Sequence, residues 1–157
     1  MKIVSNMIEA HLIRRLNSKT EYLALKRSPD QIYPNLWQPI TGKVNGDEAG
    51  FRAALRELTE ETGIKPDRMW VVPNINSFYN PAGDYISMIP VFLFEITSDQ
   101  AVKLSDEHCN FFWGTQSEVR ALYAWPGQRL STDIISEFTE KEDNTLKFVE
   151  ITAFDGI

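Results

Sequence analysis

Two stretches near the start of the chain alternate apolar and polar residues, which is typical of β-strands. The first covers residues 8–16, and the second is EYLALKR, residues 21–27. The four residues between them, NSKT, are of the types that favour a turn. The pattern therefore predicts a β-hairpin over residues 8–27.

An apolar stripe of helical period replaces this alternation further along the chain and predicts an α-helix over residues 48–62. Four apolar side chains recur there at three- and four-residue spacing: Phe51, Ala54, Leu55 and Leu58. Gly63 follows, and glycine is common just past the end of a helix. The helix is expected to bury one side and to expose the other.

Shorter signals predict the remaining elements. The segment SPDQIYPNLW carries two prolines and is expected to be a loop, and WQPITGKV after it a short strand. Strands are also expected in MWVVPNINSFY, in ISMIPVFLFEI and around FFWG. A short helix is expected from Ser117 to residue 123, a second helix over 130–141 starting near 131–133, and a last strand over 146–154. These elements predict an α+β fold with a mixed sheet.

Size and charge narrow the class of protein. The chain has 157 residues, of which 43% are hydrophobic and 24% charged, so we expect one globular domain over 1–157. The net charge of −6 argues against a protein that binds nucleic acid polymers, because such binding relies on an excess of Lys and Arg. A small anionic ligand could still bind together with cations.

Cysteine content and apolar runs indicate the compartment. Cys109 is the single cysteine and cannot form an intrachain disulfide, so we interpret it as an inert thiol. The first residues lack the apolar run of a signal peptide, and the longest apolar stretch, MIPVFLF, is too short to cross a bilayer. A cytoplasmic protein without a membrane partner is expected.

The helix carries the acidic cluster RELTEE, in which Glu57, Glu60 and Glu61 fall within an arc of about 100°. Like charges at this spacing repel one another by about 0.2–0.5 kcal/mol per pair, so the cluster gains from a counter-charge. Carboxylates without a neighbouring His or Cys suit hard divalent cations such as Mg²⁺ or Mn²⁺. Taken alone, the six residues favour a solvated helix surface over a metal site.

The residues around this cluster resemble the signature box of the Nudix hydrolases. That box has a Gly, five residues, a Glu, seven residues, and then Arg-Glu-aliphatic-any-Glu-Glu-any-Gly-aliphatic. All nine fixed positions are filled: Gly42, Glu48, Arg56, Glu57, Leu58, Glu60, Glu61, Gly63 and Ile64. A second, less specific similarity over residues 8–140 is to the dihydroneopterin triphosphate and dATP pyrophosphohydrolase subgroup.

The resemblance implies an α/β/α sandwich and Mg²⁺-dependent hydrolysis of a diphosphate bond, with Mn²⁺ as a substitute. Metal ligands would be Glu57, Glu60, Glu61 and the backbone carbonyl of Thr41. Glu57 would also orient or deprotonate water. Arg56 would pair with neighbouring acids, Glu48 among them.

Several residues outside the box are further candidates, each with an ordinary structural alternative. Glu107 could act as a base or an extra metal ligand, or be a loop carboxylate, and His108 is interpreted as structural or surface-exposed. Basic residues that could meet phosphates are Lys26 and Arg27. Aromatic residues that could stack on a base, or belong to the core, are Tyr33, Trp37, Phe78 and Tyr79.

Three functional hypotheses follow from the resemblance. The first is a pyrophosphohydrolase that cuts a nucleoside or pterin triphosphate into pyrophosphate and monophosphate. The second keeps the reaction but acts on a nucleotide sugar or a dinucleoside polyphosphate. The third is a sensor that binds nucleotides without cutting them. A homodimer is compatible with all three.

Overall fold

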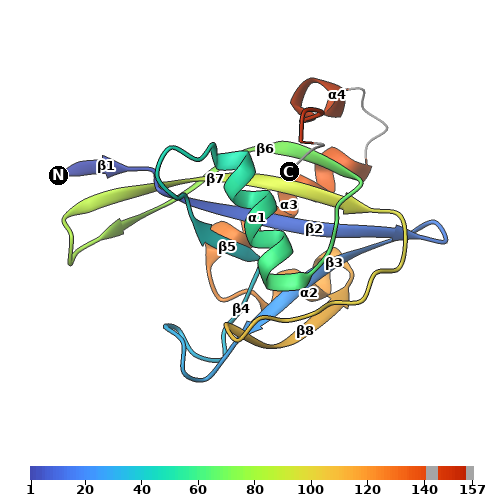
Figure 1. The fold of residues 1–157 in the computed structure, drawn as a ribbon, viewed down its shortest axis with the longest axis horizontal. Coiled ribbons are helices and arrows are strands. Elements are labelled where there is room, and N and C mark those ends of the chain that lie inside the picture. The colour runs from blue at the N-terminus through green and yellow to red at the C-terminus, as the bar shows by residue number, and fades with distance from the viewer. Residues whose placement is uncertain (141–144, 155–157) are drawn as a thin grey trace.

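A computed structural model describes residues 1–140 and 145–154, and within them a mixed eight-stranded sheet lies between helices (Figure 1). The strands are β1 (Lys2–Val4), β2 (Met7–Leu16), β3 (Lys19–Arg27), β4 (Trp37–Gln38), β5 (Ile40–Lys43), β6 (Arg68–Asn80), β7 (Tyr85–Ile96) and β8 (His108–Gly114). The helices are α1 (Gly50–Thr62), α2 (Gln116–Leu122), α3 (Pro126–Glu140) and α4 (Leu146–Val149).

The long strand β7 organises the sheet. It pairs in parallel with β1 and β2 and antiparallel with β6. The strand β2 continues the sheet through antiparallel pairing with β5 and β3, and β3 pairs with β4 and β8. The predicted hairpin of β2 and β3 is confirmed, and its turn residues Asn17 and Ser18 both have positive φ, as a tight two-residue turn requires.

Helices cover both faces of the sheet, so the expected α/β/α sandwich is confirmed. In Figure 1, α1 lies in front of the sheet and α2 and α3 lie behind it. The central strands are buried on both sides because successive side chains point to opposite faces. In β2, Ile8, Ala10 and Leu12 enter the core under α1, whereas Ile13 enters the core under α2 and α3.

The predicted acidic helix is confirmed and begins at Gly50, two residues after the expected start. Ala53, Ala54, Leu55 and Leu58 are buried against the sheet and fix the orientation of α1. Gly63 ends the helix with φ of 68°, and its N–H donates to the carbonyl of Thr59. Of the three glutamates, Glu61 is buried together with these apolar residues, Glu57 is partly buried and Glu60 is exposed.

The predicted strand over 146–154 is wrong. Residues Leu146–Val149 form the one-turn helix α4. The segment then meets the edge of β6, where Glu150 forms an isolated bridge with Trp70 and the N–H of Ile151 donates to the carbonyl of Met69. Leu146 and Val149 pack on the core behind the sheet, and this tertiary contact decides the local conformation.

The two helices behind the sheet begin earlier than expected. Thr115, not Ser117, caps α2: its side chain accepts from the N–H of Glu118, whose carboxylate accepts from the N–H of Thr115. The helix α3 begins at Pro126 rather than near 131–133, and residue 141 of the predicted helix lies outside the described residues. The short strand β1 was not predicted. None of the helices within the described ranges has the length and apolarity needed to cross a membrane.

Candidate active site

The C-terminal half of α1 presses the carboxylate of Glu57 against the backbone of β5. A Cβ atom built on Gly42 would lie 2.1 Å from Cδ of Glu57. No side chain fits in that space, so the glycine allows this close approach of helix and strand. Gly42 thereby leaves room for the carboxylate of Glu57 in this position.

Arg56 connects the acidic residues to one another. Its guanidinium donates to both carboxylate oxygens of Glu48 at 3.0 Å, to Glu57 at 2.7 Å and to Glu60 at 3.3 Å. A further bond, of 2.8 Å, goes to the carbonyl of Lys43 in β5. The pairing with Glu48 is therefore present, and hydrogen bonding to Glu48 raises the pKa of Arg56. One cation thus holds three carboxylates beside the strand.

Glu61 is the member of the cluster that Arg56 does not hold. Its side chain is only 3% exposed, and neither carboxylate oxygen accepts a hydrogen bond from any of the described residues. Burial raises its pKa well above the usual value, and the charges of Glu57 and Glu107 raise it further. The folded protein therefore holds a buried carboxylate without a compensating partner.

His108 does not supply that partner. Its Nδ1 lies 4.0 Å from Glu61, and its pKa is lowered to about 4 by burial and by the charge of Arg27. The imidazole is consequently neutral near pH 7. Its Nε2 contacts Nε2 of Gln38 at 3.2 Å, which makes Gln38 a neighbour of the site that the sequence did not indicate. His108 is buried, in agreement with the structural interpretation and not with a surface position.

The donor set fits a hard divalent cation. Glu61 offers two oxygens without partners, and Glu57 and Glu60 follow the same side of the helix. Within residues 1–140 and 145–154, no three acidic, His or Cys side chains already meet as a metal shell. Glu57 and Glu60 instead contact Arg56, so they would have to turn toward a cation that Glu61 binds.

Two of the three predicted charged residues outside the box lie around this cluster. The charge of Glu107 acts on both Glu57 and Glu61 and raises their pKa, which places it close to them. Arg27 ends β3 and its charge lowers the pKa of Glu61, so it belongs to the α1 side of the sheet. Lys26, one residue earlier, belongs to the opposite side because strand residues alternate.

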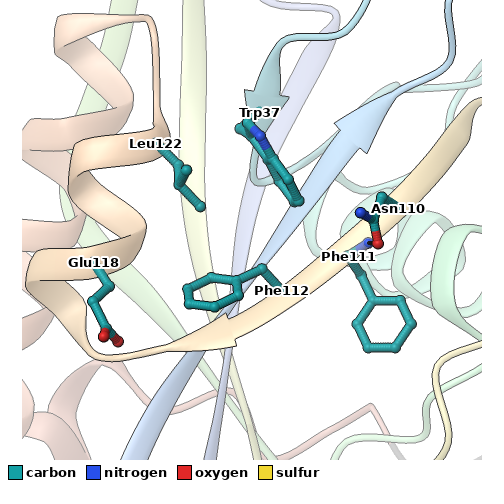
Figure 2. Close-up of a pocket in the computed structure, with 6 residues that line it drawn as sticks. All are labelled: Trp37, Asn110, Phe111, Phe112, Glu118 and Leu122. Carbon is teal, nitrogen blue, oxygen red and sulfur yellow. Dashed lines mark hydrogen bonds between the residues drawn. The ribbon is translucent and has the colours of Figure 1, made fainter.

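The predicted aromatic residues fall into two separate places. Trp37 lines a pocket beside α2 (Figure 2), and Tyr33 in the preceding loop makes an edge contact with Trp125 at 5.4 Å between centroids. Phe78 and Tyr79 lie near the end of β6, about half exposed, and Tyr79 donates to Asp84 at 3.0 Å. The structure therefore does not gather the four into one stacking site.

A buried polar group on the far side of the sheet was missed. His11 Nε2 contacts Glu9 at 2.7 Å, and Asn76 donates to the other oxygen of Glu9 at 2.7 Å. Burial raises the pKa of Glu9, but the hydrogen bond and charge of His11 and the other hydrogen bonds outweigh it and lower the pKa. The signal in the sequence was the alternation of Glu9 and His11 with apolar residues in a strand buried on both faces.

A sandwich with a carboxylate helix packed against a glycine of the adjoining strand is the arrangement expected of a hydrolase of diphosphate bonds. The model of the NUDIX domain matches residues 6–133, and the chain belongs to this family of hydrolases. The family resemblance seen in the box is thus confirmed.

Individual relatives refine the comparison. The chain is 31% identical over 104 residues to the asymmetrical bis(5'-nucleosyl)-tetraphosphatase of Caenorhabditis elegans, covering 65% of this chain and 72% of the relative. A crystal structure of a C. elegans Ap4A hydrolase binary complex superposes with a TM-score of 0.72 at 23% identity, over 87% of this chain and 98% of that one. The E. coli dihydroneopterin triphosphate pyrophosphohydrolase shares the fold with a TM-score of 0.65 at 19% identity, over 80% and 92%.

Proposed function

We propose that this chain is a divalent-cation-dependent hydrolase that cuts the polyphosphate chain of a dinucleoside polyphosphate. The observation that carries the proposal is Glu61, a buried carboxylate without a partner next to Glu57 on the helix of the signature box. The similarity to an asymmetrical bis(5'-nucleosyl)-tetraphosphatase supports this substrate class. Because of this similarity, we favour a dinucleoside polyphosphate as substrate over the nucleoside or pterin triphosphate that the sequence alone favoured.

Glu57, Glu60 and Glu61 would hold the cation, with the backbone carbonyl of Thr41 as a further ligand. Mg²⁺ is the expected ion and Mn²⁺ its substitute, because all of these donors are oxygens. When bound, such an ion neutralises phosphate charge and lowers the pKa of a coordinated water. It would also compensate the charge of Glu61, which the described residues leave unpaired.

The remaining residues of the site would position the reactants. Arg56 and Gly42 hold the carboxylate of Glu57 in place, where it can orient water or accept its proton. Glu107 is close enough to influence the same carboxylates and is a second candidate for the base. Arg27 supplies a positive charge on the same side of the sheet, where an anionic substrate gains from it.

A substrate panel tests the proposal. Purified protein would be incubated with Mg²⁺ and, in turn, with diadenosine tetraphosphate, nucleoside triphosphates, dihydroneopterin triphosphate and nucleotide sugars, and products would be separated by chromatography. Preferential conversion of the dinucleotide into two mononucleotides supports the proposal. Pyrophosphate release from triphosphates alone would instead support a pyrophosphohydrolase of nucleoside or pterin triphosphates. Tight nucleotide binding without turnover of any compound would indicate a sensor.

A further inference from the structure

A pocket beside α2 lies apart from the carboxylate cluster. Its volume is about 380 Å³, which is within the usual range for small-molecule sites. Its walls come from three elements, β4, β8 and α2, and the lining residues are Trp37, Asn110, Phe111, Phe112, Glu118 and Leu122. Figure 2 shows Trp37, Phe112 and Leu122 arranged around a common space, with Phe111 on the other side of the β8 ribbon from Phe112.

The register of the strands places a cation on the same face of the sheet as two of these lining residues. Lys26 in β3 is directly opposite Trp37 in β4 on one side and Asn110 in β8 on the other. Residues directly opposite one another in antiparallel strands share a face of the sheet. Ala24 and Phe112 form the next such pair along β3 and β8. Lys26 therefore stands on the pocket's face, between two of its lining residues.

The ammonium of Lys26 is free to meet a ligand. Within residues 1–140 and 145–154 it makes no hydrogen bond and no ion pair, although it is partly buried. The ring of Phe112 is seated over Gly114, where an added Cβ would lie 2.3 Å from its Cε1. An oriented aromatic wall beside an unpaired cation matches a ligand that combines a flat ring with a phosphate.

Polar groups at the pocket wall can form hydrogen bonds with the edge of such a ring. Asn110 uses its carbonyl oxygen to accept from the N–H of Phe111, which leaves its NH₂ group as a donor. Glu118 has one carboxylate oxygen bonded to the N–H of Thr115 and another that can accept from an amino group. The wall thus offers a donor and an acceptor, as a nucleobase with an exocyclic amine requires.

We propose that this pocket binds the second nucleoside of the dinucleoside polyphosphate, with a phosphate on Lys26. The inference rests on the proposed function, since it assigns one end of that substrate. The two places lie on opposite faces of the sheet, and β8, which pairs only with β3 among the described strands, forms an edge between them. β8 begins at His108 beside Glu61 and reaches Phe112 four residues later, so the phosphate chain would pass around this edge. A substrate with a nucleoside at each end of its phosphate chain has a group available for each location.

The first test probes the pocket without turnover. Adenosine monophosphate would be titrated into metal-free protein while the indole N–H signal of Trp37, assigned with Trp37→Phe, is followed by NMR. Ribose 5-phosphate, which lacks the base, serves as the comparison ligand. We expect adenosine monophosphate to shift the signal, Phe112→Ala and Lys26→Gln to weaken this binding at least about fivefold, and Phe148→Ala to leave it unchanged. Phe148 is 78% exposed on α4 and is a matched control.

The second test links the pocket to catalysis. The kcat/KM for diadenosine tetraphosphate should fall at least about fivefold in Phe112→Ala and in Lys26→Gln, and not in Phe148→Ala. If both pocket variants cut the dinucleotide at the wild-type rate, or adenosine monophosphate does not shift the Trp37 signal, the pocket assignment is overturned. The proposed hydrolase activity is unaffected by that result. If no cation supports cleavage of the dinucleotide by the wild type, the proposed function itself fails. Lys26→Gln alters a partly exposed residue, so its result does not depend on repacking.

Discussion

The carboxylate of Glu57 rests on Gly42, and the space between helix and strand is too small for even one methyl group: an added Cβ would lie 2.1 to 2.3 Å from three atoms of the glutamate. The carboxylate of Glu57 therefore requires a residue without a side chain at position 42 of the signature box. Its backbone conformation has no positive φ, so the requirement is one of space.

Replacement of that glycine should disturb the site and not the fold. In Gly42→Ala, Glu57 must swing away or α1 must shift, and we expect kcat/KM to fall at least about tenfold, because small misplacements of catalytic groups are costly. Gly50→Ala is the matched control, since a Cβ there meets its nearest atoms at 3.8 Å, an ordinary contact. Equal activity of the two variants, by initial rates at saturating Mg²⁺, would contradict the role assigned to Gly42.

Glu60 and Glu61 should both be needed for turnover. Glu60→Gln and Glu61→Gln each keep the shape of the side chain and remove its charge. We expect each to lower turnover at least about a hundredfold, which corresponds to about 2.7 kcal/mol of transition-state stabilisation. Circular dichroism would verify that the variants are folded. Wild-type rates in both variants would eliminate the metal assignment.

The buried charge of Glu61 should make the metal-free protein less stable as the pH rises. Its pKa is higher in the folded than in the unfolded state, so its contribution favours folding at low pH and is lost as pH rises through the folded pKa. In a chelator, the melting temperature of the wild type relative to that of Glu61→Gln should fall as the pH rises above 4.5, the usual pKa of this carboxyl. Glu57, whose pKa is also raised, contributes in the same direction.

Controls separate the contribution of Glu61 from that of other groups, and two outcomes would contradict the prediction. The comparison with Glu61→Gln also cancels the contribution of His108, whose pKa, lowered to about 4, changes stability in the opposite direction as the pH rises. Identical pH profiles for wild type and Glu61→Gln would show that the carboxylate is compensated in solution. Added Mg²⁺ should raise the melting temperature of the wild type more than that of the variant, and the reverse order would exclude Glu61 as a ligand.

The polar group behind the sheet should matter for stability. Glu9→Ala leaves the buried His11 and the partly buried Asn76 without their shared partner, and such losses cost about 3–5 kcal/mol of unfolding free energy. Urea denaturation would measure the change. Asp99→Ala provides the comparison, because its side chain is 79% exposed and its ion pair with Arg14 is worth at most about 1 kcal/mol. Similar losses in both variants would show that burial of Glu9 has little energetic consequence.

The sequence predicted best those features that depend on neighbours within one helix. The apolar stripe of α1, its end at Gly63 and the shared side of Glu57, Glu60 and Glu61 all follow from helical period alone. The contact of Glu57 with Gly42 was implied only by the spacing of the box, since nothing local brings β5 to the helix.

Long-range contacts explain what the sequence did not reveal. Asn76 reaches Glu9 across 67 positions, and no local pattern pairs them. The C-terminal segment looked extended, but α4 forms where Leu146 and Val149 meet the core behind the sheet. Two missed boundaries did have readable signals: Thr115 and Glu118 have the spacing of a capping box, and proline is favoured at a first helical position such as Pro126.

The pair formed by Glu9 and His11 also specifies how β2 aligns with its neighbours. This strand is buried on both faces, so apolar burial alone discriminates poorly between the native alignment and a slip by one residue. A slip would exchange the two faces, place the carboxylate and the imidazole under α1, and separate them from Asn76. The same shift would change the register between β2 and β5 and displace Gly42 from its contact with Glu57. A polar contact on the other face of the sheet thus favours the strand alignment in which the carboxylate cluster can assemble.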